Sequence, residues 1–283
     1  MALQLTGIRR YPVKSCSGFD LDQAVVERCG LTCDRRWMVV DESGVVVTAR
    51  EHPTMLLITP ELTDTGLLLH APSQPDLAIG RPTEAQLEDV TVWRSTVAAS
   101  PAAHDAHDWL SAVIGKPVRL VYLDDADRRP PNPDFADTDD RVSFADAYPV
   151  LLATEESLQA VNGWIAEGPR AEEGPLPITR FRPNLVVKGA SAWSEDGWRA
   201  LRIGDAVFRA VKGCDRCVLT TIDPVTAAKG KEPIATLAKH RKWDGKTWFG
   251  MNLIPDNPGV TVRVGDDVEI LREVPAPDGP PRP

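Results

Sequence analysis

Short apolar runs, separated by turn-forming residues, dominate the first 123 positions of the chain. Residues 37–40 and 45–48 are rich in valine and flank Asp41-Glu42-Ser43-Gly44, which predicts a β-hairpin. Residues 3–8, 66–70, 90–93 and 118–123 add further predicted strands. Strands at such short intervals are typical of barrels and sandwiches.

Three segments predict helices instead. Ser100 and Pro101 suit a cap and a first helical position, and apolar residues then recur at helical spacing until Gly115. Thr154 suits the cap of a helix over residues 155–167, where Glu155 favours the positive helix end. A short third helix is predicted over residues 233–240.

The second half otherwise predicts strands, at residues 148–153, 185–187, 206–208, 218–221, 260–264 and 267–271. The predicted class is therefore α+β, predominantly β, with an N-terminal β-barrel-like part and a second β-barrel flanked by a few helices. Residues 124–143, rich in Asp, Arg and Pro near their start, predict a linker or mobile loop between domains at 1–123 and 144–273. The proline-rich residues 274–283 are expected to be disordered.

Charge and cysteine content exclude several classes of protein. The net charge of −9 argues against a general binder of nucleic acid or anionic membrane, although it allows a local basic pocket. Five cysteines cannot form a fully paired disulfide framework. The sequence shows no signal peptide and no apolar run of membrane-spanning length, so we expect a cytoplasmic protein with free thiols.

Cys214-Asp215-Arg216-Cys217 is the sharpest local feature, and its spacing leaves four interpretations open. It could be half of a zinc site, for which Cys29 and Cys33 are the nearest further candidates. It could be a redox dithiol, or two ordinary buried cysteines. The fourth interpretation is one thiolate ligand to a larger cofactor, favoured by Arg216 and Lys212 because nearby cations lower a thiol pKa.

Several segments together resemble a known family. Residues 11–16 (YPVKSC) resemble the opening of the MOSC N-terminal β-barrel domain, and residues 180–184 (RFRPN) and 214–224 (CDRCVLTTIDP) resemble two hallmark segments of the MOSC domain. Residues 231–237 and 258–266 are similar as well. The motifs occur in the family's order and extend over nearly the whole chain, with the nearest similarity to amidoxime-reducing components and their bacterial relatives.

The resemblance implies a molybdenum cofactor (Mo-molybdopterin) bound between the two parts of the protein. It implies Cys217 as the protein ligand to molybdenum and the catalytic residue, whereas Cys214 matches a position that is not a ligand. The cofactor contacts that the resemblance implies, or that flank the ligand, are Lys14, Ser15, Arg35, Thr154, Glu155, Arg182, Asn184, Asp215 and Arg216. Cationic side chains and backbone N–H donors would also be needed to bind the phosphate of this cofactor.

The implied activity is a reductase that abstracts the oxygen atom of N-hydroxylated substrates, namely amidoximes, hydroxylamines or N-hydroxylated nucleobases. The alternative is a carrier of the cofactor or of a persulfide, without turnover. We expect electrons from a separate donor protein, which could be ferredoxin-like, cytochrome b5-like or a flavin reductase, because no cysteines for a fused ferredoxin follow Cys217. We expect a monomer with no nucleic-acid or membrane partner.

Overall fold

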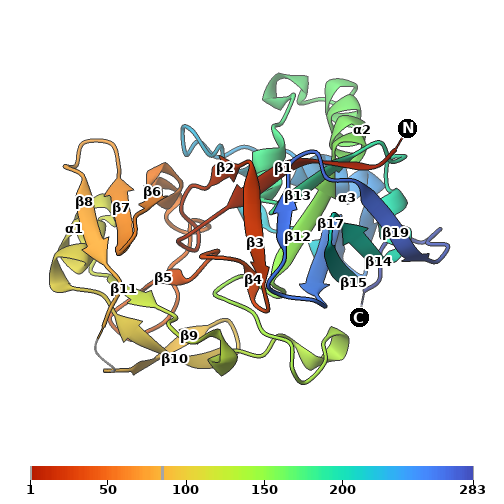
Figure 1. Ribbon diagram of the computed structural model, residues 1–283. Coiled ribbons are helices and arrows are strands. Elements are labelled where there is room, and N and C mark those ends of the chain that lie inside the picture. The colour runs from red at the N-terminus through yellow and green to blue at the C-terminus, as the bar shows by residue number, and fades with distance from the viewer. Residues whose placement is uncertain (1, 84–85, 283) are drawn as a thin grey trace.

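The computed structural model describes residues 2–83 and 86–282, and within them strands greatly outnumber helices. The α-helices in these ranges are α1 (His104–Ile114), α2 (Glu155–Ala166) and α3 (Ile234–His240). This content confirms the predicted class, α+β and predominantly β. Figure 1 shows two lobes side by side, with α1 at the outer side of one lobe and α2 and α3 in the other.

The second lobe is organised by one large, mostly antiparallel sheet with the order β19-β14-β15-β17-β12-β13-β1-β2, to which β16 is attached through β17. The pair β12–β13 is parallel. The strands are β1 (Gln4–Arg10), β2 (Phe19–Leu21), β12 (Val150–Thr154), β13 (Leu185–Lys188), β14 (Trp198–Ile203), β15 (Ala206–Asp215), β16 (Lys242–Trp243), β17 (Lys246–Pro255) and β19 (Val268–Glu273).

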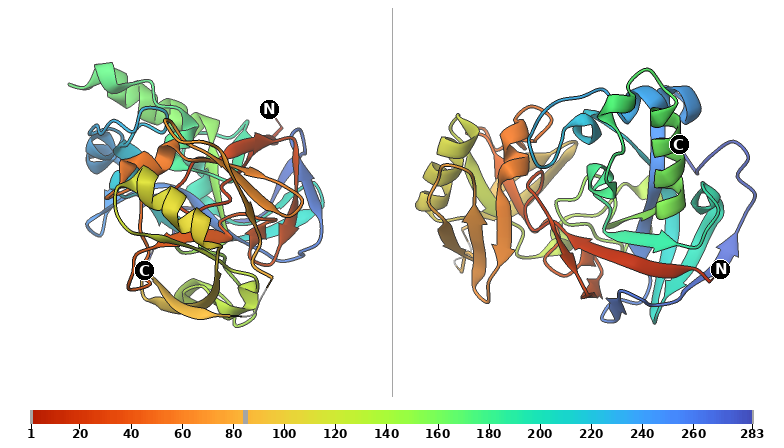
Figure 2. Two further views of the ribbon diagram at one scale, coloured as in Figure 1. Left: turned by 90° about the vertical axis from the view of Figure 1, so that its left-hand side faces the viewer. Right: turned by 90° about the horizontal axis from the view of Figure 1, so that it is seen from above.

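Smaller sheets complete the molecule, with the orders β5-β11-β10-β9, β6-β7-β8 and β18-β3-β4. The first two belong to the first lobe (Figure 2). Their strands are β3 (Gln23–Glu27), β4 (Gly30–Leu31), β5 (Trp37–Val40), β6 (Thr59–Leu62), β7 (Gly66–His70), β8 (Leu77–Gly80), β9 (Glu88–Val92), β10 (Ser95–Pro101), β11 (Arg119–Tyr122) and β18 (Thr261–Arg263).

Each lobe has its own hydrophobic core. Trp37, Met55 and Leu110 are buried in the main core of the first lobe. Leu152 and Phe208 are buried in that of the second lobe. Two separate hydrophobic cores are the usual basis for two structural units in one chain of this length.

The chain crosses between the lobes near its start, so the units are not contiguous in sequence. β1 pairs with β13, and β3 pairs with β18, so strands within the predicted domain 1–123 join sheets of the second lobe. The first strands therefore contribute to the second lobe, and the following segment carries the chain across to the first. The cavity described below lies beside this crossing.

The predicted helices are found, with one start displaced. Thr154 caps α2, because its side chain accepts a hydrogen bond from the Ser157 amide, and Gly115 ends α1 in the left-handed conformation. The prediction that Ser100 caps α1 and that Pro101 is its first residue is wrong. Ser100 and Pro101 instead pair with β11 as the end of β10, and α1 begins at His104.

Other differences follow from tertiary pairing. Residues 218–221 form a 3-10 helix (η7, Val218–Thr221) rather than the predicted strand, and residues 45–48 make only isolated bridges. Strands β14 and β17 were not predicted. β17 is buried on both faces and so lacks the alternation that identifies a half-exposed strand.

Two segments expected to lack fixed structure make specific contacts. In residues 124–143, the Asp140 carboxylate lies 2.6 Å from the Arg209 guanidinium of β15. In the tail, the Gly213 amide donates a hydrogen bond of 2.8 Å to the Pro281 carbonyl, and Arg282 pairs with Asp244. Residue 283 lies outside the described residues. The tail thus packs against the strand that leads to Cys214.

Candidate functional site

A cavity of about 340 Å³ is lined by residues from both lobes. Its wall brings together most of the site residues predicted from sequence, which come from segments far apart in the chain. The predicted residues that line it are Lys14, Ser15, Arg35, Arg182, Asn184, Asp215, Arg216 and Cys217. Thr48, Arg50, Trp93, Asp146, Tyr148, Arg180 and Cys214 also line it, among others.

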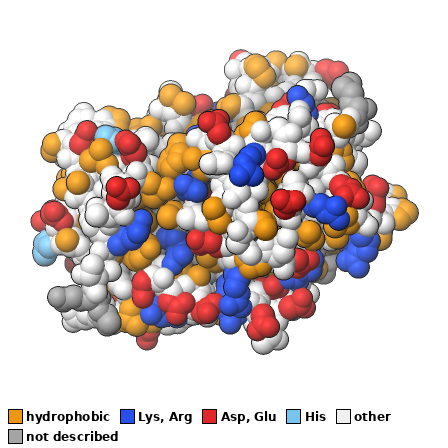
Figure 3. Space-filling model, in the orientation of Figure 1, with side chains coloured by type: hydrophobic (Ala, Val, Ile, Leu, Met, Phe, Trp, Pro, Cys, Tyr) orange, Lys and Arg blue, Asp and Glu red, His pale blue; other side chains and the backbone are white. Residues whose placement is uncertain are grey.

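The cavity wall carries a strong excess of positive charge. Six cationic side chains line it, against two carboxylates: Lys14, Arg35, Arg50, Arg180, Arg182 and Arg216, with Asp146 and Asp215. The chain as a whole has a net charge of −9, and the face in Figure 3 shows acidic and basic side chains interspersed. The concentration of cations is therefore local, and it suits an anionic ligand.

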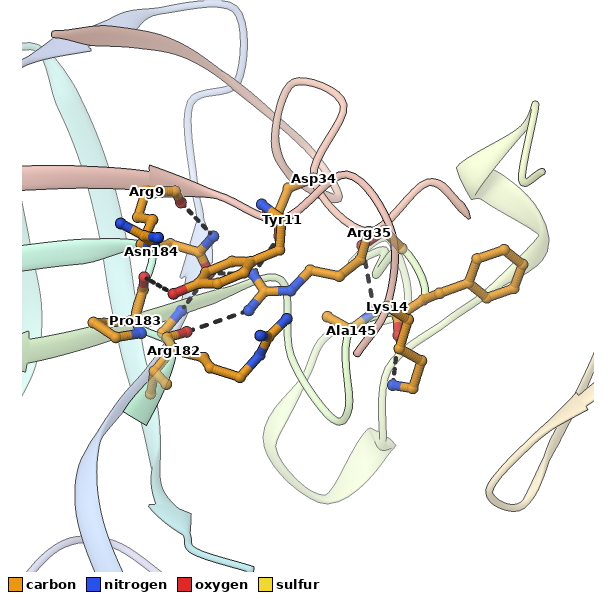
Figure 4. A network of polar contacts seen from close by, with 12 residues as sticks. Arg9, Tyr11, Lys14, Asp34, Arg35, Ala145, Arg182, Pro183 and Asn184 are labelled. Carbon is orange, nitrogen blue, oxygen red and sulfur yellow. Dashed lines mark hydrogen bonds and ion pairs between the residues drawn. The ribbon is translucent and has the colours of Figure 1, made fainter. Parts of the chain in front are cut away.

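Tyr11 orients two of these cations. The Arg35 and Arg182 guanidinium carbons lie 4.3 and 4.2 Å from the centre of its buried ring, within cation–π range (Figure 4). Arg182 also donates to the Cys16 carbonyl at 2.8 Å. Burial lowers the pKa of Arg182 to about 10, so it stays cationic at neutral pH.

Asn184 connects Arg35 to the large sheet. Its side-chain oxygen accepts hydrogen bonds from Arg35 Nη1 at 2.8 Å and from the Leu151 amide at 3.2 Å. Its Nδ2 donates to the Arg9 carbonyl at 3.1 Å (Figure 4). Arg35 also pairs with the buried Asp34 at 2.5 Å. Asn184 is 1% exposed, and its amide is engaged by protein atoms, so it positions Arg35 within the cavity wall.

The backbone of three predicted residues is unusual. Ser15, Arg35 and Arg182 have φ values of 69°, 47° and 56°, in the left-handed region that is uncommon for residues other than glycine. Such strain concentrates at functional sites, where surrounding structure holds it in place. All three of these residues line the same cavity.

Lys14 forms a second group of polar contacts, on the side of the first lobe. Its Nζ donates to the Phe144 carbonyl at 2.7 Å and to Asp146 Oδ1 at 2.5 Å. Burial lowers the pKa of Lys14 to about 8, even though Asp146 opposes the shift. Burial alone would raise the pKa of Asp146, but the charges of Lys14, Arg50 and Arg35 outweigh it and hold that pKa below its ordinary value.

The two cysteines of the C-x-x-C segment have different surroundings. Arg216 Nη1 lies 2.8 Å from the Cys214 sulfur, and Arg216 Nη2 donates to the Phe181 carbonyl. The expectation that Arg216 would favour a thiolate at Cys217 is therefore not supported by the geometry. Burial raises the pKa of Cys214, and Arg216 only partly offsets this effect. Cys217 precedes η7, and no residue in the described ranges hydrogen-bonds its sulfur.

Asp215 lies between two lysines. Its carboxylate is 3.6 Å from Lys212 Nζ and 3.2 Å from Lys246 Nζ. Lys212 is the second cation that was expected to act on the cysteines, and it pairs with this carboxylate instead. Burial would raise the pKa of Asp215, but the two lysines outweigh it and lower that pKa.

Thr154 and Glu155 do not line the cavity. Thr154 is buried at the start of α2, where it accepts from the Ser157 amide and donates to Glu195 at 3.3 Å. Glu155 accepts a hydrogen bond of 2.6 Å from the Thr6 hydroxyl of β1. Both contacts join α2 to neighbouring elements, and a direct role at the cofactor stays a prediction for these two residues.

Two family models match almost the whole chain. The model of the MOSC N-terminal beta barrel domain matches residues 2–117, and that of the MOSC domain matches residues 139–269. The chain belongs to the MOSC family. Residues 118–138 lie between the two matches and overlap the predicted linker, and residues of both matched regions line the cavity.

Curated relatives agree with this assignment. The MOSC chain is 33% identical to human "Mitochondrial amidoxime-reducing component 1" over 92% of its own length and 81% of that protein. It is 35% identical to the mouse protein of the same name, over 92% of its length and 80% of that protein. It is also 32% identical to "Molybdenum cofactor sulfurase" of Oryza sativa subsp. japonica, over 89% of its length but 32% of that protein.

Two features of the described residues bear on the alternatives. Within residues 2–83 and 86–282, no group of three or more His, Cys, Asp or Glu side chains is placed to hold a metal ion. Among these described residues, the C-x-x-C pair of this MOSC chain therefore has no further ligands that a structural zinc site would need. No helix in the same ranges has the length and apolar character to cross a membrane.

Sequence reasoning missed Arg50, Trp93, Asp146 and Arg180 as residues of the cavity wall. Arg180 opens the motif at residues 180–184, so the sequence did carry a signal for its place in the cavity wall. Its Nη2 donates to Asp223 at 3.2 Å, and its Nε has no hydrogen-bond partner in the described part of the chain. The other three lie in loops, where no sequence pattern indicates that they reach the cavity.

Proposed function

We propose that this protein is a molybdenum-cofactor-dependent reductase of N-hydroxylated compounds, which include amidoximes, hydroxylamines and N-hydroxylated nucleobases. The observation that carries the proposal is the donor set of one cavity: the Cys217 sulfur, without a hydrogen-bond partner among described residues, and a local excess of cations. Two relatives that match most of the chain are named amidoxime-reducing components, which supports the reaction class.

The residues present fit such a cofactor. A cysteine sulfur is a soft ligand that suits a sulfur-coordinated metal, and Cys217 would supply that ligand from the cavity wall. When bound, the cofactor would supply the molybdenum centre that takes up the substrate oxygen, which is chemistry no protein side chain provides. Cys214 is the weaker candidate for the ligand, because Arg216 already hydrogen-bonds its sulfur.

The cationic residues would hold the anionic end of the cofactor. Arg35 and Arg182 are fixed by Tyr11, Asn184 and the Cys16 carbonyl, so little side-chain freedom remains to be lost on binding. The Nε atoms of Arg180 and Arg216 are buried without partners among the described residues, and their other nitrogens hold protein oxygens or sulfur. Planar guanidinium groups suit phosphate geometry.

The proposal includes a separate electron-donor protein of the ferredoxin-like, cytochrome b5-like or flavin reductase type. We also propose that the protein is a cytoplasmic monomer that acts on a small-molecule substrate. It would have no nucleic-acid or membrane partner. These elements come from the sequence and from the resemblance to the family.

A second function is favoured by one specific observation, the match to proteins named molybdenum cofactor sulfurase. In that case the same cavity would hold the cofactor, or Cys217 would carry a persulfide, without turnover of an N-hydroxylated substrate. The chain covers about a third of the length of that rice relative.

One experiment separates the two functions. The protein, purified from a host that makes the cofactor, is mixed with a chemically reduced viologen dye and then with hydroxylamine or benzamidoxime. A reductase oxidises the dye only when substrate is added, and Cys217→Ala abolishes the reaction. A carrier retains molybdenum but leaves the dye reduced, which would overturn the proposed reductase.

A further inference from the structure

Trp93 occupies a position in the chain that disfavours a large side chain. It is the first residue of the two-residue turn between β9 and β10, and Val92 pairs with Ser95 across that turn. Its φ is 55°, in the left-handed region where hairpin turns favour Gly, Asn or Asp. A bulky residue in this conformation is strained, and the surrounding structure must hold it in place.

Core packing does not account for this tryptophan. Trp93 is 39% exposed, and it belongs to none of the hydrophobic core clusters that the described residues form. It lines the same cavity as Cys217. An exposed aromatic ring on the rim of a polar cavity is the kind of surface that binds a planar ligand.

Polar contacts at its edge and face fix the ring. Trp93 Nε1 donates to Asp146 Oδ1 at 3.3 Å, and the Arg50 guanidinium carbon lies 4.3 Å from the ring centre. Asp146 also binds Arg50 at 3.3 Å and Lys14 at 2.5 Å. One carboxylate thus holds an aromatic ring and two cations together on the first-lobe side of the cavity.

We propose that Trp93 is a specificity-determining residue, against which a planar aromatic N-hydroxylated substrate stacks as it enters the cavity. This inference rests on the proposed reductase function. The adjacent Arg50 would attract a carboxylate on the substrate ring, so the favoured substrates are planar and neutral or anionic. A small substrate such as hydroxylamine has no ring to stack and gains nothing from Trp93.

Three substrates test the assignment: hydroxylamine, benzamidoxime and 4-carboxybenzamidoxime. In Trp93→Ala, kcat/KM falls about tenfold for both aromatic compounds, chiefly through KM, and changes less than about twofold for hydroxylamine. Trp93→Phe keeps a flat ring and retains most of the aromatic activity. Arg50→Gln lowers kcat/KM for 4-carboxybenzamidoxime more than for benzamidoxime.

A binding measurement gives a readout that does not depend on turnover. Benzoate is a planar anion that cannot be reduced in this reaction. It is titrated calorimetrically into the wild-type protein, Trp93→Ala and Arg50→Gln. We expect its affinity to fall about tenfold in Trp93→Ala and in Arg50→Gln. The molybdenum content of every variant is measured, because an unchanged content separates a substrate effect from loss of cofactor.

The inference is overturned if Trp93→Ala lowers kcat/KM equally for all three substrates, leaves all three unchanged, or loses molybdenum. If wild-type protein loaded with molybdenum reduces none of the three, both the proposed function and this inference fail. If hydroxylamine is reduced while the aromatic substrates are insensitive to Trp93, only the inference fails.

Discussion

The guanidinium of Arg216 hydrogen-bonds the sulfur of Cys214, at 2.8 Å, rather than that of Cys217. The two cysteines share one cavity wall and one short motif, but only Cys217 has a sulfur free of hydrogen bonds to the described residues. The same arginine also holds the Phe181 carbonyl, so Cys214 helps to fix the position of a cation. This difference makes the pair chemically unequal and leads to separate predictions for each member.

The charge of Lys14 should control anion binding as pH rises. Its pKa is lowered by burial to about 8, from an ordinary value of 10.5, so the folded protein loses this cation near pH 8. Affinity for an anion in the cavity should then fall through that pH. Sulfate is a suitable probe, because its own charge is constant between about pH 6 and 10. Calorimetric titration of the cofactor-free protein with sulfate measures the effect.

Two variants sharpen this test. Lys14→Gln should lower sulfate affinity below pH 8 and remove the step. Asp146→Asn should move the step to lower pH, because it removes the carboxylate that favours the charged lysine. Lys188→Gln, at an exposed position on β13, serves as the control. A step of equal size in Lys14→Gln would show that another group is responsible.

The fold and the site were predictable from sequence to different extents. Features that depend on neighbouring residues were predicted correctly: Thr154 caps α2 and Gly115 ends α1, as the local sequence pattern indicates. Predictions were wrong where the structure of a segment depends on residues far away in the sequence. Ser100 and Pro101 suit a helix start, but β11 pairs with them as a strand. Residues 218–221 have the composition of a strand and form η7 instead.

The site shows the same division. Lys14, Arg182 and Cys217 lie within motifs that the family resemblance identifies, and all three line one cavity. Arg50 and Trp93 reach that cavity from loops of the first lobe. Their approach depends on how the two lobes pack, which neither periodicity nor local spacing encodes.

Buried Glu195 should make the protein less stable as pH rises. It is fully buried, its Oε2 has no partner among the described residues, and burial raises its pKa to about 7 from 4.5. The folded state therefore binds more protons than the unfolded state between about pH 4.5 and 7, so this group's stabilising contribution is lost across that window. Glu195→Gln should raise the free energy of unfolding at pH 8 by about 3 kcal/mol, since each pKa unit corresponds to about 1.4 kcal/mol.

Denaturant unfolding at pH 4.5 and pH 8 checks this prediction. The gain in Glu195→Gln over wild type should disappear at pH 4.5, where the glutamate is already protonated in the folded protein. Glu172→Gln, at an exposed position, should change stability little at either pH. An equal gain at both pH values would contradict the assignment to Glu195 ionisation.

A variant of Thr154 tests whether this residue has a structural role or contacts the cofactor. Thr154→Ala removes the hydrogen bond from the Ser157 amide and should destabilise the protein by about 1 kcal/mol. Because Thr154 does not line the cavity, we expect the molybdenum content to stay at the wild-type level, contrary to the cofactor contact that the family resemblance implies. Thr138→Ala, at an exposed position, is the matched control for stability. A loss of molybdenum without a loss of stability would favour a direct contact with the cofactor.

The most direct test of the account is the molybdenum content of three proteins purified from a host that makes the cofactor. The wild type should carry about one molybdenum per chain, and Cys217→Ala less than about a tenth of that. Cys214→Ala should keep most of its molybdenum, because it disturbs Arg216 without removing the proposed ligand. Full retention by Cys217→Ala, or equal loss in the two variants, would contradict the proposal that Cys217 alone binds the metal.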